Sequence, residues 1–425
     1  MLRLRHRLEK GEQSFLQRVF HWPGRPRDVT IPPPRSQPRP RQRVAGPFAR
    51  RAPTMETPPS PALGIAAISI DQPVWQLENG WFGDTIPRKF TQHTGIEARS
   101  ISVDDEVTMG LKAIRRLQQE SGCNLADCRG IVFVSPSFIP PSVARRHLTP
   151  HEATRERPGR AARQLAREVG VRRCRTLGLN WFCCGYSRAF SVVTRRWAPR
   201  LGLERDDFLL VVVATRISRI TDYGCTTTGG LFGDMASATI LAPMTSRRYP
   251  VHFEIVGAHA GKQAVDRPAF DFHRRSHVAV PAAGGARGHD ETRLVYSLDG
   301  MTIADLAPRA MSAAVVDGLA AAGLRGTDVD FVVPHQAGTG IVRFTGMKLE
   351  EAGVGGELIN GLTRRTGNVS ACSIPHALRE SWSRLRGLVA CPTAAVGSPG
   401  RPEVLQGCIL LRSTAVHEAQ VRVAA

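Results

Sequence analysis

Short apolar strands alternate with helical segments along most of this chain, and this alternation strongly limits the folds open to it. In the first half, the pattern predicts strands at 63–70, 131–134, 177–179 and 208–214. The second half repeats the alternation, with strands predicted at 330–334, 387–391 and 407–412. Helices are predicted between them, as at 107–117 and 341–351. The pattern indicates an α/β protein, in which ligands bind beyond the carboxyl ends of strands.

A cysteine lies at one of these strand-to-helix turns. The strand 177–179 precedes Cys183, and residues 187–197 carry apolar side chains at helical spacing after it. The free N–H groups and the positive end of a helix favour the thiolate, which is the nucleophilic form. Gly185 allows the backbone to pack closely, or to bend, behind the sulfur. By itself the turn fits either a nucleophile or an inert packing cysteine.

Two polar residues occupy comparable places in the second half. His335 follows the strand 330–334, and Asn368 precedes a helix that has Pro375 in its first turn. Cys183 and His335 both lie where α/β proteins bind their ligands. Spacing along the chain leaves open whether the two side chains meet.

The net charge of +20 is unevenly distributed. Residues 1–54 contain 13 Lys/Arg and 3 Asp/Glu, so this segment supplies half of the total. The remainder lacks the interleaved aromatic residues of a platform for single-stranded nucleic acid. We therefore expect no nucleic-acid partner. A basic surface suits an acidic protein or a phosphate-bearing substrate equally well.

Apolar runs and cysteine spacing bear on the compartment. The longest apolar run, residues 208–214, is far shorter than a membrane span, and no secretory signal is recognisable. Nine cysteines include no C-x-x-C pair, and the histidines are scattered, so no metal site is expected. A reduced, cytoplasmic location without membrane attachment is the simplest interpretation.

The first 60 residues differ in composition from the rest. They are rich in Arg and Pro and contain too little apolar surface to form a core, so we expect a disordered basic tail. Met55 is a plausible alternative start, and residues 1–60 should be dispensable for fold and chemistry. We divide the remainder into an N-terminal half, 61–246, which carries Cys183, and a C-terminal half, 247–425, which carries His335 and Asn368.

Four motifs occur in a specific order, at Cys183-Cys184-Gly185-Tyr186, at 232–238 (F-G-D-M-A-S-A), at 333–337 (V-P-H-Q-A) and at 367–375 (G-N-V-S-A-C-S-I-P). The ordered set resembles the 3-oxoacyl-(acyl carrier protein) synthase III family of thiolase-fold enzymes, whose corresponding motifs are C-A-G-F, F-G-D-G-A-x-A, P-H-Q-A and G-N-T-S-A-A-S-I-P. The resemblance covers about residues 61–415.

The resemblance implies a five-layered αβαβα fold of two similar halves, and a homodimer. It implies that Cys183 is the acylated nucleophile and that His335 and Asn368 are its partners. The two would donate hydrogen bonds to a malonyl thioester as it loses CO₂, and the resulting carbanion would attack the acyl group. The substrates would be acyl-CoA or acyl carrier protein thioesters, with no metal or redox cofactor, in fatty-acid or polyketide metabolism.

Two other functions stay open: acyl transfer from Cys183 to an alcohol or amine, and a partner subunit without turnover. Retention of both His335 and Asn368 favours condensation, because simple acyl transfer needs no two-donor site. Three further residues are given ordinary roles: Cys184 in packing, His376 in a helix, and Asp234 as a turn residue bonded to backbone amides.

Several positions depart from the family pattern. The chain has Lys89 where the family has the tryptophan that stacks on adenine, His93 and Gly340 where it has arginines, Gly338 where it has an asparagine, and Met235 where it has a glycine. The glycine-rich loop near the C-terminus is altered at 396–402, and extra residues occur at 150–159. Arg343 could replace the arginine missing at 340. These differences suggest a divergent member in specialised metabolism.

Overall fold

The computed structural model describes residues 61–86, 89–171, 173–225, 227–281 and 291–424. The basic segment 1–60, expected to be disordered, lies outside the described residues. Across the described ranges, none of the helices is both long and apolar enough to span a lipid bilayer.

The strands of the first half form one sheet in the order β1-β7-β6-β4-β5. The neighbours β1–β7 and β7–β6 are antiparallel, whereas β6–β4 and β4–β5 are parallel. All eight residues of β6 are buried, as expected for a central strand covered on both faces. The strands are β1 (Leu63–Asp71), β4 (Cys128–Val134), β5 (Arg175–Leu179), β6 (Phe208–Thr215) and β7 (Met235–Pro243).

The second half repeats this pattern strand for strand. Its order is β8-β14-β13-β11-β12, with β8–β14 and β14–β13 antiparallel and the other neighbours parallel. The two sheets join where β1 pairs with β8 over two residues, Gly64 with Glu254 and Ile65 with Phe253. These strands are β8 (Phe253–Ala264), β11 (Phe331–Val332), β12 (Glu357–Leu358), β13 (Leu388–Val396) and β14 (Glu403–Ser413).

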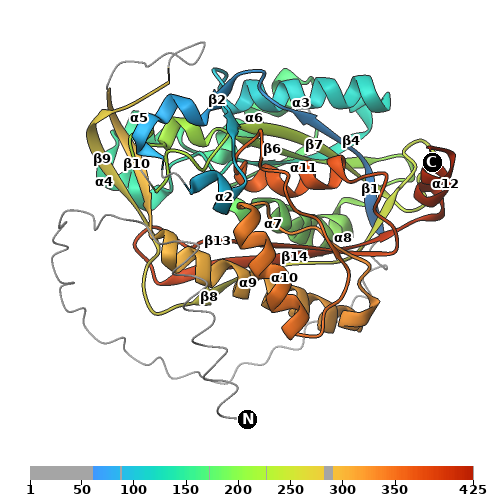
Figure 1. Cartoon of the computed structure of the whole chain (residues 1–425). Helices are drawn as coiled ribbons and strands as arrows, with labels where there is room; N and C mark the ends of the chain where they lie inside the picture. The colour runs from blue at the N-terminus through green and yellow to red at the C-terminus, as the bar shows by residue number, and fades with distance from the viewer. Residues whose placement is uncertain (1–60, 87–88, 172, 226, 282–290, 425) are drawn as a thin grey trace, which may run out of the picture.

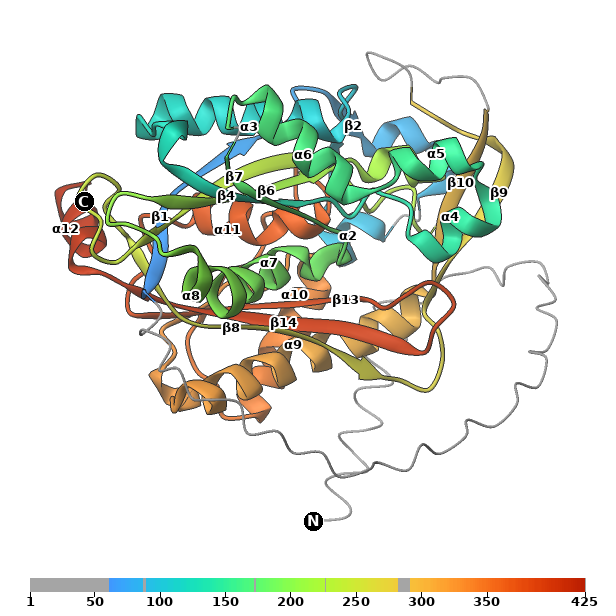
Figure 2. The same cartoon turned by 180° about the vertical axis from the view of Figure 1, so that it is seen from behind.

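Helices cover both outer faces and fill the space between the sheets (Figures 1 and 2). Helices α3 (Glu106–Ser121) and α6 (Pro158–Glu168) pack on the first sheet. Helix α9 (Gly300–Ala322) packs on the second, with α10 (Thr339–Glu351) against α9. The middle layer contains α7 (Gly185–Val192) and α11 (Ser373–Glu380). The expected five-layered αβαβα arrangement of two similar halves is confirmed.

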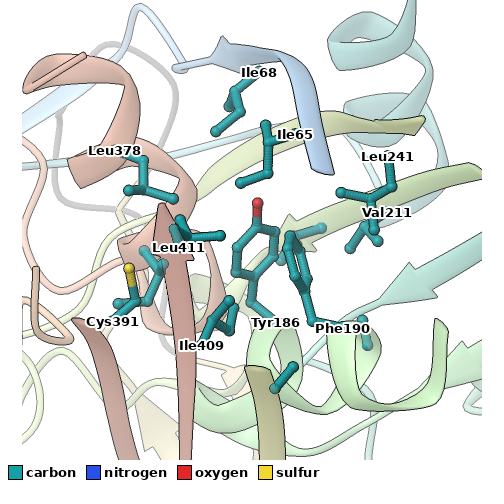
Figure 3. Packing of buried hydrophobic residues seen from close by; sticks show 14 of the residues in the cluster. Ile65, Ile68, Tyr186, Phe190, Val211, Leu241, Leu378, Cys391, Ile409 and Leu411 are labelled. Carbon is teal, nitrogen blue, oxygen red and sulfur yellow. The ribbon is translucent and has the colours of Figure 1, made fainter. Parts of the chain in front are cut away.

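The two halves share one core in the middle layer. Tyr186 and Phe190 project from α7 between Ile65 of β1 and Ile409 of β14 (Figure 3). All four side chains are fully buried, and the Tyr186 hydroxyl lies 3.0 Å from Thr239 Oγ1. Helix α7 thus packs against strands of both sheets. The turn immediately before α7, at residues 182–184, is therefore positioned with respect to both halves.

The outer helices α3 and α9, which follow β1 and β8, have matching ends. Asp105 and Asp299 each cap a first turn by accepting a backbone hydrogen bond, from Thr108 and Thr302 respectively. Each helix ends at a left-handed glycine, Gly122 with φ +66° and Gly323 with φ +67°. The repeat in the sheets therefore extends to the way the helices begin and end.

Several elements differ from the sequence-based prediction. The predicted strand 330–334 is only Phe331–Val332 as a paired strand, because Pro334 has no N–H to continue the ladder. The helix after the cysteine begins at Gly185 and widens into a π-helical turn at Val193–Trp197 before α8 (Ala198–Leu201). The arginine-rich stretch 145–175 contains the end of α4 (Pro141–His147), α5 (Pro150–Arg155) and α6.

The remaining elements lie at the periphery. A hairpin of β9 (Phe270–Val278) and β10 (Glu291–Leu298) and the long α9 were not predicted from the sequence. Shorter pieces are β2 (Gln76–Glu78), β3 (Ala98–Ser100), α2 (Phe90–Thr94) and the last described helix, α12 (Ala415–Ala424).

Candidate active site

Cys183 lies in a tight turn between β5 and α7. A three-residue 3₁₀ turn, η3 (Phe182–Cys184), leads directly into the helix. Phe182 has φ +44°, a left-handed conformation that side-chain-bearing residues rarely adopt. Gly185 is required by close packing, because a Cβ there would lie 2.4 Å from Val134 Cγ1. The turn is therefore strained on one side of the sulfur and tightly packed on the other.

A second turn of the same form carries Asn368. The 3₁₀ turn η8 (Ser370–Cys372) leads into α11, and Ser370, like Phe182, has a positive φ of +49°. Cys183 Sγ lies 3.3 Å from Ser370 Oγ, and the Ser370 N–H donates to Asn368 Oδ1 at 2.9 Å. The structure thus brings Cys183 and the Asn368 turn together across the two halves.

The orientation of Asn368 follows from these contacts. Its Oδ1 is occupied by the Ser370 N–H, and its NH₂ group makes no hydrogen bond with any residue that the structure describes. The side chain is 6% exposed. Asn368 is therefore held with its oxygen satisfied and its donor group available.

His335 lies three residues beyond the end of β11. Its N–H donates to Pro392 O of β13 at 2.9 Å, and the next residue, Gln336, donates its N–H to Ser373 Oγ at 2.6 Å. Ser373 is the first residue of α11, so the His335 loop is tied to the helix that follows the Asn368 turn. One residue after Pro392, Thr393 Oγ1 lies 3.0 Å from Ser187 Oγ of α7. Hydrogen bonds therefore tie the His335 loop to α11 and, through β13, to α7.

Burial keeps the His335 ring neutral. The residue is 3% exposed, and burial lowers its pKa to about 4. Its Nδ1 has no hydrogen-bond partner among the described residues. A neutral imidazole carries one N–H and can donate a hydrogen bond at neutral pH without being charged.

The ionisation of Cys183 differs from the sequence-based expectation of a favoured thiolate. Burial raises the pKa of Cys183 to about 11, and the hydrogen bond from Ser370 offsets only part of that rise. None of the groups that shift it is a positively charged side chain. The free-energy cost of removing the thiolate from water exceeds the stabilisation that the Ser370 hydroxyl provides, so Cys183 is a thiol at rest.

The three ordinary roles predicted for neighbouring residues agree with the structure. Cys184 is fully buried beside Ala395 and Leu405, as a packing residue should be. His376 is buried within α11. Asp234 accepts backbone hydrogen bonds from Ser102 and Ser218, and burial raises its pKa to about 6.

Two residues of the site were missed by sequence reasoning. Ser370 belongs to the quoted motif 367–375 but was given no role, and Asn180 was not singled out. Asn180 stands two residues before Phe182, and its Oδ1 accepts the Phe182 N–H at 3.3 Å. The signal that could have identified both is that each is a polar residue next to a predicted strand-to-helix turn, where side chains often bond to the backbone.

The segment that departs from the family pattern borders the site. Gly338 has φ +134° and lies close to Thr94, where a Cβ would come within 3.4 Å of the Thr94 carbonyl oxygen. Thr363 Oγ1 also donates to the Thr94 carbonyl oxygen, at 3.3 Å. The end of α2 therefore packs beside the loops of His335 and Asn368, and Lys89 at the start of α2 is exposed. In the part of the chain that the structure describes, no group of three or more His, Cys, Asp or Glu side chains could hold a metal ion.

Known proteins resemble this chain in sequence over most of its length. Residues 319–387 match the C-terminal family model of 3-oxoacyl-(acyl-carrier-protein) synthase III. The chain is 29% identical to beta-ketoacyl-(acyl-carrier-protein) synthase III of Geobacillus kaustophilus over 301 residues, 70% of this chain and 81% of that protein. It is 27% identical to the enzyme of the same name from Deinococcus deserti, covering 75% of this chain and 83% of the relative. The chain is therefore similar to beta-ketoacyl synthase III enzymes over most of its length.

Solved structures share the fold of this chain. The priming beta-ketosynthase of the R1128 polyketide pathway superposes with a TM-score of 0.61 at 21% identity, covering 85% of this chain and 99% of that one. A tetronic acid condensing enzyme superposes with a TM-score of 0.61 at 16% identity, covering 83% and 100%. These two enzymes thus share the fold in which Cys183, His335 and Asn368 are placed here.

Proposed function

We propose that this chain is a condensing enzyme of the beta-ketoacyl synthase III type, with Cys183 as its nucleophile and His335 and Asn368 as hydrogen-bond donors. The observation that carries the proposal is the contact between Cys183 and the Asn368 turn through Ser370. The loop of the buried, neutral His335 is hydrogen-bonded to α11, which follows that turn. The substrates are acyl and malonyl thioesters of coenzyme A or of a carrier protein.

The reaction proceeds in two stages. In the first, Cys183 loses its proton and its sulfur attacks the acyl thioester; the donor's C–S bond breaks, and the departing thiol takes up a proton. Because the pKa of Cys183 is raised to about 11, only a small fraction of the resting enzyme carries the thiolate at neutral pH. The acyl group then rests on Cys183 as a thioester.

The second stage forms the carbon–carbon bond. The malonyl thioester loses CO₂, and the electron pair of the broken C–C bond passes into an enolate whose negative charge lies on the thioester oxygen. N–H groups of His335 and Asn368 aimed at that oxygen stabilise the charge as it develops. The carbanion then attacks the acyl carbon, the bond to Cys183 sulfur breaks, and the 3-oxoacyl thioester leaves.

We propose the biological context from the similar proteins and from the positions at which this chain differs from the family motifs. A priming ketosynthase and a tetronic acid condensing enzyme are among the structures that share the fold, and both names describe specialised pathways. The exposed Lys89 stands where the family has the tryptophan that stacks on adenine, and Gly340 where it has an arginine that favours carrier protein. We therefore assign the chain to specialised acyl metabolism, acting as a homodimer, with coenzyme A or carrier-protein thioesters as partners.

The experiment separates the two stages. Acyl-enzyme formation is followed by intact mass, and CO₂ release is followed with a malonyl thioester. His335→Ala and Asn368→Ala should still acylate, but should release CO₂ about 100- to 1000-fold more slowly, the usual effect of losing one such donor. Cys183→Ala should give no adduct, whereas the matched variant Cys184→Ala should be acylated like the wild type.

Two outcomes would overturn the proposal. An adduct that survives in Cys183→Ala would place the nucleophile elsewhere. A wild type that acylates but never releases CO₂ from any malonyl donor would leave acyl transfer to an alcohol or amine as the reaction.

A further inference from the structure

The turn that carries Cys183 is held from one side by a single amide side chain. Asn180 lies between the end of β5 and the turn. Its Nδ2 donates to the Phe138 carbonyl oxygen at 2.6 Å, and its Oδ1 accepts the Phe182 N–H at 3.3 Å. The side chain thus connects the loop after β4 with the strained residue that immediately precedes Cys183.

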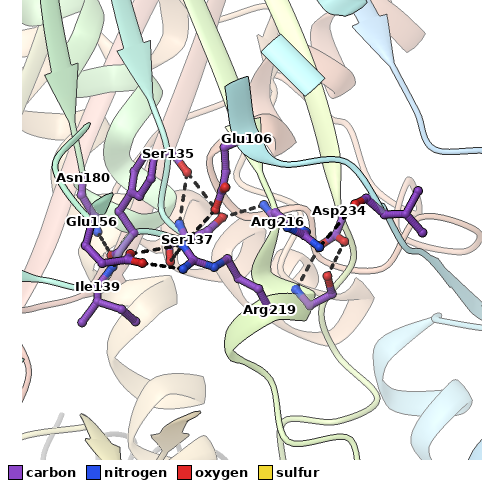
Figure 4. A network of polar contacts seen from close by, with 12 residues as sticks. Glu106, Ser135, Ser137, Ile139, Glu156, Asn180, Arg216, Arg219 and Asp234 are labelled. Atoms are coloured by element: carbon purple, nitrogen blue, oxygen red, sulfur yellow. Dashed lines mark hydrogen bonds and ion pairs between the residues drawn. The ribbon is translucent and has the colours of Figure 1, made fainter. Parts of the chain in front are cut away.

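The loop contacted by Asn180 is itself fixed by a carboxylate from the extra residues at 150–159. Glu156, at the end of α5, accepts the Ile139 N–H at 2.8 Å (Figure 4). The Glu156 side chain is only 10% exposed, so its charge requires a partner. That partner is Arg219, whose guanidinium lies 2.5 Å from Glu156 and 3.2 Å from Glu106.

One guanidinium, that of Arg219, bridges the two carboxylates of this cluster. Burial opposes the charge on Arg219, but Glu106 and Glu156 outweigh it and hold the pKa of Arg219 above its usual value. Ser137, in the same loop, adds a 2.6 Å hydrogen bond from the Arg216 N–H to its Oγ. The loop 135–139 is therefore a firm support for Asn180 and not a free connection.

Strain at Phe182 makes such a support necessary. A phenylalanine at φ +44° costs free energy and keeps that conformation only where its surroundings enforce it. Two contacts do so here: Asn180 holds the backbone N–H, and Phe270 of β9 packs edge-on against the ring with centroids 5.1 Å apart. Releasing the N–H would let the turn relax and move Cys183 away from Ser370.

We propose that Asn180 is a positioning residue for Cys183 and that Glu156 acts on the nucleophile through it. The inference rests on the proposed role of Cys183. It gives the extra residues at 150–159 a function: they carry the carboxylate that fixes the supporting loop. Neither Asn180 nor Glu156 is assigned a contact with substrate.

The test compares two reactions of Cys183: acylation, which depends on the orientation of the sulfur, and alkylation, which depends mainly on its intrinsic reactivity. In Asn180→Ala, acylation of Cys183 by an acyl-CoA should slow about 10- to 100-fold, because small misplacements of a nucleophile are costly. The KM for the acyl-CoA should change less than about twofold, because substrate binding is untouched. Alkylation of Cys183 by iodoacetamide, a small reagent that needs no fixed approach, should slow less than acylation does, and no more than in Ser370→Ala.

Matched variants complete the design. Asn124→Ala is the control, because Asn124 Oδ1 likewise accepts a backbone N–H two residues on, that of Ala126, at 3.1 Å. Asn124 is distant in sequence from the Cys183 turn, so this variant should leave acylation unchanged. Glu156→Gln should slow acylation in the same direction as Asn180→Ala, but less. Asn180→Asp keeps the acceptor for the Phe182 N–H and loses the donor to the Phe138 carbonyl oxygen, so its acylation rate should lie between those of the wild type and Asn180→Ala. Asn180→Asp also replaces Asn180→Ala as the test variant if Asn180→Ala fails to fold.

Hydrogen exchange of the peptide spanning 180–184 gives a readout that does not depend on the chemistry. Exchange should be faster in Asn180→Ala and in Glu156→Gln than in the wild type or Asn124→Ala. Unchanged exchange, wild-type acylation by a folded Asn180→Ala, or equal losses of alkylation and acylation would overturn the inference. A wild type that is alkylated but never acylated would instead overturn the proposed function. In that case the hydrogen-exchange rate of the peptide 180–184 in Asn180→Ala would decide whether Asn180 positions Cys183.

Discussion

Cys183 is a thiol at neutral pH, and this fixes how its reactivity should vary with pH. The thiolate is the reactive form, and its fraction rises about tenfold per pH unit below the pKa. With the pKa of Cys183 raised to about 11, alkylation by iodoacetamide should rise about tenfold per unit from pH 7 to pH 9.5 without a plateau. Peptide mapping of the Cys183 adduct provides the measurement.

A matched variant tests the cause of this behaviour. Ser370→Ala removes the hydroxyl that lowers the pKa of Cys183, so alkylation at any given pH should become slower. A plateau by about pH 8 in the wild type would contradict the prediction and would mean that the helix end stabilises the thiolate more than burial destabilises it.

The sequence pointed to the proposed catalytic side chains more readily than to the residues that support them. Cys183, His335 and Asn368 lie in recognisable motifs, so their types and order were available. The contact of Ser370 with Cys183 spans 187 positions of sequence, and the φ of Phe182 has no signature in its residue type. The raised pKa of Cys183 was also not predictable, because it depends on how much water reaches the sulfur after folding.

At the scale of elements, α12 is held to the body by the buried His417, whose ring packs near the partly buried His252. His417 Nε2 lies 2.8 Å from the Leu385 carbonyl oxygen, and its ring packs 4.3 Å from Phe253 and 5.8 Å from His252, measured between centroids. Burial, together with His417, lowers the pKa of His252 to about 4. Because the folded pKa lies below the unfolded value near 6.5, the unfolded chain binds the proton more readily.

It follows that stability contributed by His252 is present above about pH 6.5 and is lost as the pH falls toward 4. The melting temperature of the wild type should fall over that range. His252→Phe keeps an aromatic ring against Trp382 and removes the titration, so its melting temperature should fall less steeply. Parallel curves for the two proteins would show that other histidines account for the pH dependence.

The buried ion cluster around Arg219 gives a second prediction at this scale. Arg219→Met leaves Glu106 and Glu156 buried without a cation, and breaking a buried pair in this way typically costs about 3–5 kcal/mol. Arg116→Met removes an exposed i,i+4 pair with Glu120 and should change the free energy of unfolding by less than about 1 kcal/mol. Urea unfolding measures both; similar small losses would mean that water reaches the Arg219 cluster.

Elements with strong periodicity were predictable, and those set by their neighbours were not. Strand β6 is apolar throughout and was found within one residue. Strand β11 was predicted too long, because pairing at Phe331 and Val332 depends on β12 and β13. The π-helical turn at Val193–Trp197 continues the apolar helical pattern, so nothing in the spacing distinguished it from ordinary helix.

For the whole molecule, the shared middle layer predicts that the two halves cannot fold separately. Helix α7 packs on β8 and β14 of the other half, and α11 packs on β1 and β7. Separating the halves would expose Tyr186, Phe190 and their neighbours, at a cost of about 1.5–3 kcal/mol for each large apolar side chain. Residues 61–246 or 247–425 produced alone should show no cooperative melting by circular dichroism.

The two halves produced together provide the control, since they should associate and melt cooperatively. Cooperative melting of either half alone would contradict the prediction and make the halves true domains. The sequence showed the alternation that makes this an α/β protein. The order of strands in each sheet was not visible, because it depends on which elements meet and not on their local pattern.

The matched turns also bear on how such a site could arise. Phe182 and Ser370 each open a three-residue turn before an eight-residue helix, so Ala371 is the counterpart of Cys183. A gene that doubled a single ancestral unit would have inherited this strained turn twice, face to face. Both copies keep an asparagine two residues before the turn, Asn180 and Asn368, whereas only one keeps the sulfur and the other has Ser370 and Ala371. Asymmetry between the copies, built on a symmetric frame, is what duplication followed by specialisation leaves behind.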